Sequence, residues 1–175
     1  MYAIARHLGV RLFAENGFAE TTLDQIAAAA GVARATFYNY FKSKEDVALA
    51  ALEEMFQQVQ LDFAPLLTSP LPWRSKIMHF LQRLIRQSYS TRELIWVWCV
   101  ESIKRGPILH SSAQFHHMLV DLFAAGQASG AVRTDRSPDD MAVDLGGITF
   151  AQIAVWYQQE ASADLADRLC AAAAM

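Results

Sequence analysis

The segment from Arg34 to Lys44 carries side chains of the types that bind a nucleic-acid duplex. Guanidinium, hydroxyl and amide groups can donate to and accept from base edges, and a small residue among them permits close approach. Lys44 follows at the end of the segment, where its ammonium group suits a backbone phosphate. One face of the predicted helix presents Ala35, Thr36, Tyr38 and Asn39, and Arg34 and Tyr40 lie at its flanks.

Two short helices joined by a tight turn would hold these groups toward the duplex. Thr22 and Gln25 have the spacing of a capping box and predict the start of the first helix. Gly31 ends that helix, because glycine adopts the left-handed backbone of a helix end readily. A second helix is expected to begin near Ala33, with Ser43 capping a further helix. This layout predicts a helix-turn-helix that reads DNA.

The run from Gly17 to Leu52 resembles the N-terminal domain of TetR-type (TetR/AcrR) bacterial transcriptional regulators. The match combines a Gly-Phe helix stop, a Thr-Thr helix start, a Gly-Val turn and the pattern Phe-Tyr-x-Tyr-Phe-x-Ser-Lys-Glu at the family's spacing. Family members often carry a basic arm before the first helix, whereas Met1 and Tyr2 lead here almost directly into an apolar pattern. Beyond about residue 60 the chain is family-like only in helical content and length.

The resemblance implies a homodimer in which each subunit has three DNA-binding helices, a long connecting helix and a variable helical domain for a small effector. By analogy with the family, the expected function is repression, with the effector releasing a palindromic operator. The resemblance places Arg34, Ala35, Thr36 and Asn39 toward the bases, and Thr22, Tyr38, Tyr40 and Lys44 on the phosphate backbone.

The sequence predicts an all-α protein with about nine helices. The 175 residues are 53% hydrophobic, with a mean hydropathy of +0.13, and show no strand-like alternation. We expect a helix-turn-helix domain over residues 1–44 and a helical ligand-binding and dimerisation domain over residues 45–175. The helix from Ser43 is expected to end at Pro65 and the turn after it, an eighth helix to reach about Gln158, and a ninth to cover 163–173.

Charge and cysteine content fit a specific DNA-binding protein of the cytoplasm. The formal net charge of −3 does not suit a protein that coats nucleic acid nonspecifically. No acidic residue lies between Asp24 and Glu45, however, so the predicted reading surface is locally positive. Cys99 and Cys170 have no paired spacing and are interpreted as reduced thiols. The N-terminus lacks the form of a secretion signal, and a cytoplasmic location is expected.

Aromatic and soft side chains in the C-terminal helices predict either an ordinary core or the wall of an apolar pocket. A few polar groups nearby would orient a ligand in such a pocket. Hydrophobic or planar effectors fit best, because the sequence has no Lys or Arg cluster for a phosphorylated ligand. The candidate pocket residues are Phe63, Trp96, Trp98, Cys99, Phe115, Met118, Thr149, Phe150 and Ile153.

A Gly-Gly pair at 146–147 predicts a close helix approach in the dimer. Each Gly within a helix costs about 1 kcal/mol relative to Ala, so close packing is one reason to retain the pair. A kink or a tolerated weakness is the alternative. In the resembled family the last two helices of each subunit form the dimer bundle, and the residues that fit this use are Gly147, Ile148, Ala151, Val155, Leu165 and Leu169.

Enzyme chemistry is the contrasting hypothesis, and the sequence does not favour it. Adjacent His116 and His117 point about 100° apart on a helix, and His110 lies roughly 10 Å from His117 along it. We therefore expect no metal site, no catalytic residue and no cofactor. A helical interaction module without a DNA role is a third possibility, but it would leave the outward polar groups of the second helix unused.

Overall fold

Eight helices make up the regular structure of the residues that the computed structural model describes, which are 2–89, 92–105 and 110–159. The all-α prediction is confirmed. The ninth helix expected over 163–173, with Leu165, Leu169 and Cys170, lies outside the described residues. The helices are α1 (Tyr2–Asn16), α2 (Leu23–Ala29), α3 (Arg34–Tyr40), α4 (Lys44–Leu67), α5 (Trp73–Tyr89), α6 (Arg92–Arg105), α7 (His110–Ala128) and α8 (Pro138–Gln158).

The predicted capping groups set the ends of the short N-terminal helices. The Thr22 hydroxyl accepts a hydrogen bond from the Gln25 backbone N–H at 3.2 Å, and the Gln25 side chain accepts one from the Thr22 N–H at 2.7 Å. Gly31 has a φ of +64°, in the left-handed region where a Cβ atom would be strained. Together these features form the predicted turn between α2 and α3, and the expected capping box is confirmed.

Buried aromatic and aliphatic side chains hold α1, α2 and α3 on the start of α4. Phe37 and Phe41, four residues apart, lie in the core beside Ile26. The α1 and α4 backbones approach closely at Gly9, where an added Cβ would lie 2.5 Å from a methyl group of Val47. The inward face of α3 is therefore committed to packing, which leaves its other face to solvent.

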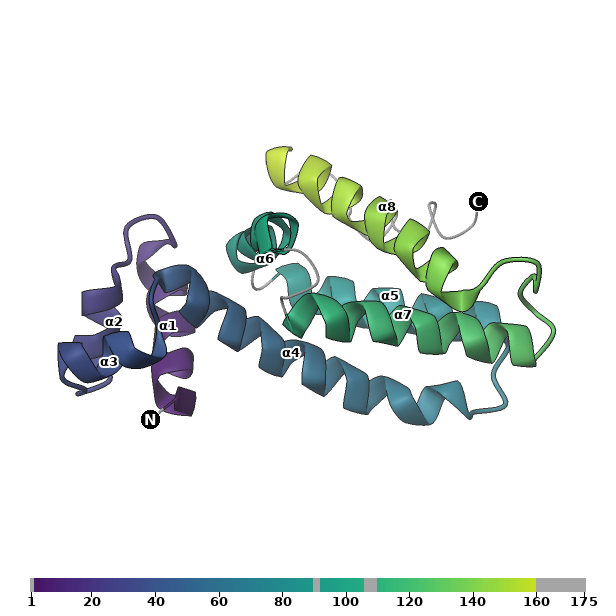
Figure 1. The fold of residues 1–175 in the computed structure, drawn as a ribbon, viewed down its shortest axis with the longest axis horizontal. Helices are drawn as coiled ribbons and strands as arrows, with labels where there is room; N and C mark the ends of the chain where they lie inside the picture. The colour runs from purple at the N-terminus through teal and green to yellow at the C-terminus, as the bar shows by residue number, and fades with distance from the viewer. Residues whose placement is uncertain (1, 90–91, 106–109, 160–175) are drawn as a thin grey trace.

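The long helix α4 connects the two halves of the molecule. Its first turns pack against α1, and the rest packs against α5, α6 and α7 (Figure 1). The Ser43 cap accepts from the Asp46 N–H at 3.2 Å, as predicted. The expected end at Pro65 is wrong, because α4 continues to Leu67 with Pro65 in its last turn. A proline there removes one backbone hydrogen bond without preventing the final residues from coiling.

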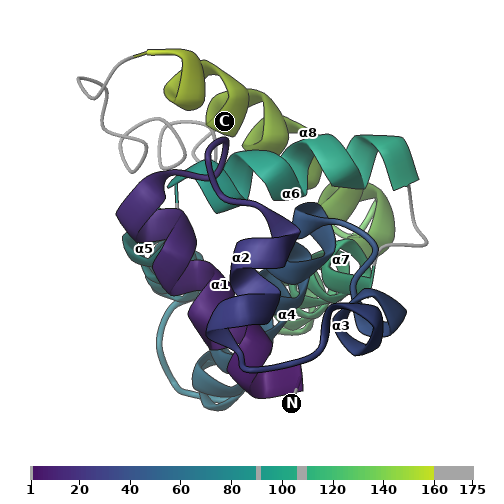
Figure 2. The same cartoon turned by 90° about the vertical axis from the view of Figure 1, so that its left-hand side faces the viewer.

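The C-terminal half stacks α5 and α7 on α4, with α8 on the outer side of α6 and α7. Viewed from the end that carries α1–α3, α6 crosses the molecule beside α8 (Figure 2). Ser137 caps α8 and Pro138 occupies its first turn, as predicted, and α8 ends at Gln158 as expected. This arrangement gives α8 an inner face that packs on α6 and α7, and an outer face that is exposed among the described residues.

Candidate nucleic-acid interface and ligand pockets

The outer face of α3 presents the side chains that the sequence predicted for DNA. Arg34, Ala35, Thr36 and Asn39 are exposed, and 56% of Tyr40 is accessible. Tyr38 is half-buried at the edge of this face. We call this set the α3 outer face. Because α3 is only seven residues long and its opposite side is buried through Phe37, this face is free to enter a groove.

Asp24 links two of the predicted DNA-contacting side chains. Its Oδ1 atom accepts a hydrogen bond from the Tyr38 hydroxyl at 3.0 Å and forms an ion pair with Arg34 Nε, also at 3.0 Å. The Arg34 guanidinium lies 5.4 Å from the centre of the Tyr38 ring. A first-turn residue of α2 therefore holds both side chains at the edge of the α3 outer face.

Other predicted phosphate contacts have partners within the chain. The Thr22 hydroxyl belongs to the α2 capping box. Lys44 Nζ donates to the carbonyl groups of Phe18 at 2.6 Å and Ala19 at 2.8 Å, and it lies 4.7 Å from the centre of the Phe18 ring. The neighbouring Lys42 donates to the Tyr38 carbonyl at the end of α3. Both lysines thus stabilise the helix ends around the α3 outer face.

The structure distributes the nine predicted pocket residues over three places. Trp98 contacts the rings of Phe115 and Phe150 at centroid distances of 5.4 and 4.8 Å. Buried beside them in the C-terminal core are Cys99, Met118, Thr149 and Ile153. Burial raises the pKa of the Cys99 thiol to about 12, as expected of a packed structural cysteine. Phe63 and Trp96 line two different pockets.

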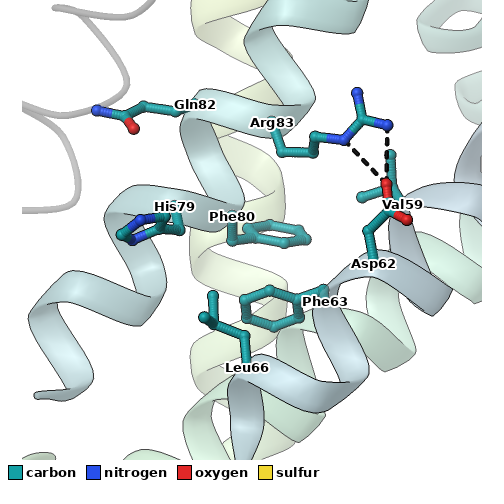
Figure 3. A pocket seen from close by; sticks show the side chains of 8 residues that line it. All are labelled: Val59, Asp62, Phe63, Leu66, His79, Phe80, Gln82 and Arg83. Atoms are coloured by element: carbon teal, nitrogen blue, oxygen red, sulfur yellow. Dashed lines mark hydrogen bonds and ion pairs between the residues drawn. The ribbon is translucent and has the colours of Figure 1, made fainter. Parts of the chain in front are cut away.

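Phe63 lines an apolar pocket between α4 and α5, which we call the α4–α5 pocket (Figure 3). Its volume is about 220 Å³. Phe63 and Phe80 form one wall and contact each other at a centroid distance of 4.9 Å, and Val59 and Leu66 add aliphatic walls. Arg83 pairs with Asp62 at 2.8 Å beside this apolar part, and hydrogen bonds from Arg83 and Gln58 hold the pKa of Asp62 below its usual value.

Trp96 lines a second pocket of about 280 Å³, where α6 meets the turn after α1. Trp96 stacks on Tyr157 of α8 at 4.8 Å, and the Glu93 carboxylate accepts from the Phe18 backbone N–H at 2.7 Å. At the other end of α6, Arg105 forms an ion pair with Asp46, the first-turn residue of α4 whose carboxylate accepts from the Ser43 backbone N–H. Helix α6 therefore contacts the turn after α1 at one end and the start of α4 at the other.

The outer face of α8 is largely apolar, with the exposed Asp144 among its small and aliphatic residues. A Cβ atom added at Gly147 meets no atom of the described residues within 4 Å, so that glycine does not serve packing among them. Ile148 and Val155 remain 37% and 36% accessible, although they are large aliphatic residues. We call the stripe that they form the α8 outer face: Val143, Gly147, Ile148, Ala151 and Val155.

The described part of the chain contains neither a cluster of metal ligands nor a membrane-spanning helix. No group of three or more His, Cys, Asp or Glu side chains there could hold a metal ion. None of the helices described combines the length and the apolar content needed to cross a bilayer. His116 instead lies 2.9 Å from the Asp139 carboxylate at the start of α8.

Several functional candidates were missed from the sequence alone. Asp24 carried a signal, since it is the only acidic residue in the span 21–44. Val59 and Leu66 lie on the same side of α4 as Phe63, at helical spacing, and this pattern indicates only a buried face. Phe80 and Arg83 gave no signal that they would face α4, because the pairing of two helices is not encoded in the period of either one.

Comparison with known proteins identifies relatives for both halves of the chain. Residues 5–51 match the family described as bacterial regulatory proteins, tetR family. Residues 74–174, more than half of the chain, match the C-terminal domain of SbtR-like transcriptional regulators. The HTH-type transcriptional repressor DhaR of Mycobacterium sp. (strain GP1) is 27% identical over 148 residues, which cover 79% of this chain and 75% of DhaR.

Two solved structures share the fold over nearly the whole chain. The TetR family repressor FadR of Thermus thermophilus, in complex with lauroyl-CoA, superposes with a TM-score of 0.84 at 23% identity. The match covers 97% of this chain and 89% of that one. FadR of Bacillus subtilis, in complex with stearoyl-CoA, gives a TM-score of 0.76 at 19% identity, with coverages of 98% and 95%.

Proposed function

Because the chain belongs to the tetR family of bacterial regulatory proteins, we propose that it is a homodimeric transcriptional repressor that a small apolar or aromatic effector releases from a palindromic operator. The observation that carries the proposal is the α3 outer face, which presents donors and acceptors opposite a buried Phe37. The similarity to the named repressor DhaR supports repression. The proposal includes a cytoplasmic location and assigns no catalytic residue.

On DNA, the α3 outer face would divide its work between bases and phosphates. Arg34 and Asn39 suit base edges, with the small Ala35 and Thr36 beside them allowing close approach. Tyr40, whose ring is more than half exposed, suits a phosphate. In a two-fold dimer the two α3 helices would read half-sites about 34–36 Å apart, so the operator would be palindromic.

The α8 outer face supplies the surface for this dimer. Its exposed aliphatic side chains recur at helical spacing around Gly147, which leaves room for a second backbone to approach. A two-fold interface uses the same patch on both subunits, so one apolar stripe is sufficient. Leu165 and Leu169 remain proposed contributors from the segment after α8.

The α4–α5 pocket is the proposed entry site of the effector. Its walls are apolar, and the similar FadR structures are complexes with lauroyl-CoA and stearoyl-CoA, which supports an effector with an apolar part. A volume of about 220 Å³ is below the roughly 300–1,000 Å³ of most ligand sites, so a small ligand or one end of a longer one would fit.

Aromatic contacts connect this pocket to the rest of the predicted set. Phe80 lies 6.5 Å from Phe115, which in turn contacts Trp98. Among the described residues, Trp98 Nε1 and Gln152 Oε1 are buried without a hydrogen-bond partner. A buried polar atom without a partner destabilises the folded protein, and a ligand with a polar group could relieve that cost. An effector that reaches the predicted residues would therefore be apolar with one polar group.

Helix α4 would carry the effect of the ligand to DNA. One end of α4 lines the pocket through Phe63 and Leu66, and the other follows α3 directly. A ligand reduces DNA affinity only if it binds more tightly to the arrangement in which the two α3 helices no longer match the groove spacing. A coupling of about 1–3 kcal/mol corresponds to a several-fold to hundredfold loss of affinity.

The first experiment selects bound fragments from a genomic DNA pool and then screens apolar compounds for release of the bound duplex. We expect a palindromic site, and compounds that lower affinity for it while changing tryptophan fluorescence. Selection of no DNA sequence would contradict the repressor assignment. Release that leaves the fluorescence of the α6 tryptophans unchanged would place the effector elsewhere.

Two variants of α4 locate the effector site. Leu66→Phe adds volume inside the α4–α5 pocket, whereas Leu61→Phe makes the same change at a residue on the same helix that is 68% exposed. We expect Leu66→Phe to keep operator affinity but to raise the effector concentration needed for release by about tenfold or more. Leu61→Phe should behave as the unaltered protein. Equal effector responses of both variants would exclude this pocket.

A further inference from the structure

The position of Asp24 gives it a role that packing does not explain. Its side chain is 47% exposed, and the Arg34 side chain that it binds is 72% exposed. Exposed ion pairs contribute little to stability, so this pair does little to hold the fold together. Both partners of Asp24, however, belong to the α3 outer face or its edge. The contact therefore bears on DNA binding, and the inference rests on the proposed function.

The geometry ties both α3 side chains to one oxygen atom. Arg34 Nε and the Tyr38 hydroxyl each lie 3.0 Å from Asp24 Oδ1. Arg34 and Tyr38 are four residues apart and therefore neighbours on α3, and the guanidinium lies over the tyrosine ring. As long as these contacts persist, the Arg34 charge is partly neutralised and the Tyr38 hydroxyl proton is engaged.

A phosphate group and the Asp24 carboxylate would compete for the same donors. Asp24 is the only acidic residue from 21 to 44, the span that contains α2 and α3. Its negative charge therefore repels the phosphates of DNA that approaches these two helices. Any duplex offers phosphates, but only an operator offers Arg34 a base edge with two acceptors in the right place. The free energy lost when Arg34 leaves Asp24 is therefore fully offset by base contacts on an operator. On other DNA it is offset only in part, by a phosphate contact.

We propose that Asp24 is a specificity-determining residue, which holds Arg34 and Tyr38 away from the phosphates of non-operator DNA. The carboxylate lowers affinity for every duplex by repulsion and by occupying two donors. It lowers non-operator affinity most, because there the released Arg34 gains only a phosphate contact. The ratio of operator to non-operator affinity therefore depends on Asp24.

The test measures the affinity of the full-length protein for two labelled duplexes of equal length, by fluorescence anisotropy over a range of salt concentrations. One duplex is the selected operator and the other a scrambled sequence. Asp24→Asn removes the charge with little change in shape. Asp121→Asn makes the same change on α7 at an exposed position, and it controls for net charge. Asp24→Glu retains the carboxylate and tests for rescue.

We expect Asp24→Asn to tighten binding to scrambled DNA by about fivefold or more, and to the operator by less than twofold. The salt dependence on scrambled DNA should steepen by about one counterion per subunit, because Arg34 then contacts a phosphate. Asp121→Asn should match the unaltered protein, and Asp24→Glu should keep most of the original discrimination. Because the Asp24 side chain is exposed, the thermal unfolding temperature should be nearly unchanged.

Two results would overturn the proposal. Asp24→Asn could change both affinities by the same factor, which would indicate a general charge effect, or it could weaken binding to scrambled DNA. The proposed function fails by a different observation, namely that the unaltered protein selects no DNA sequence at all. The two failures are therefore distinguishable in one data set.

Discussion

At the scale of single residues, Lys44 connects the turn after α1 to the start of α4. Its ammonium group binds the carbonyl groups of Phe18 and Ala19, which follow the end of α1. It also stands at the first position of α4, directly after the loop that follows α3. Lys44, which was predicted to bind a phosphate, therefore also holds the turn after α1 against the start of α4.

Replacing Lys44 by Ala should lower the free energy of unfolding by about 1–3 kcal/mol, because two charge-assisted hydrogen bonds are lost. Affinity for all DNA sequences should fall in parallel, with a flatter salt dependence. Urea unfolding and anisotropy on two duplexes measure the two effects separately. A variant with unchanged stability would show that the carbonyl contacts are dispensable, and unchanged salt dependence would exclude a phosphate role.

At the scale of elements, α6 makes polar contacts at its two ends, one with the turn after α1 and one with the first turn of α4. Glu93 accepts from the Phe18 N–H, and Arg105 pairs with Asp46. Arg105 also pairs with Glu101, and hydrogen bonds from Lys104 and Arg105 keep the pKa of Glu101 low despite its burial. A displacement of α6 would consequently act on the turn after α1 through Glu93, and on the first turn of α4 through Arg105.

Glu93→Ala tests the contact at the start of α6. The Phe18 amide proton would lose a charged acceptor at 2.7 Å, and its hydrogen exchange should accelerate by roughly tenfold, as a loss of about 1.4 kcal/mol would produce. Amide exchange followed by NMR reports on this proton directly. Glu20→Ala removes another exposed carboxylate near the same turn and should leave the rate unchanged. Equal Phe18 rates in both variants would mean that the contact does not persist in solution.

At the scale of the whole molecule, the relevant unit is a pair of subunits. The α3 outer face of one subunit can read only a half-site, and the second reading helix must be held at a fixed distance from it. Helix α8 lies across α7 from α4 (Figure 1), and a Cβ atom added at Gly147 on the α8 outer face meets no atom of the described residues within 4 Å. We expect dimer stability and operator binding to depend on this face together.

Gly147→Leu should dissociate the dimer and abolish tight operator binding. A Cβ atom at this position meets no atom of the described residues within 4 Å, so the folded subunit should be at least as stable as before, since Gly is about 1 kcal/mol less favourable than Ala in a helix. Overpacking at a tight helix contact typically costs 1–3 kcal/mol. Sedimentation at low concentration measures the assembly, with Ala124→Leu on the exposed side of α7 as the control. A dimeric Gly147→Leu protein would place the interface on another surface.

Local sequence patterns were sufficient to predict the N-terminal helices and the chemistry of the α3 outer face. Capping boxes, glycine turns and helical spacing act over three to five residues, so Thr22, Gly31 and Ser43 could be assigned without knowledge of distant contacts. The end of α4 was misplaced at Pro65 because tertiary packing can extend a helix past a residue of low propensity.

Only the tertiary structure decided which residues of different helices share a surface. The meeting of Phe63 with Phe80, of Glu93 with Phe18, and of Asp24 with Tyr38 depends on how pairs of helices are oriented. Helical periodicity specifies which face is buried but not which partner covers it, because many apolar faces are of similar width and composition. For that reason the side chains of the α3 outer face could be predicted from the sequence. The α4–α5 pocket and the ion pair between Asp24 and Arg34 could be found only in the folded structure.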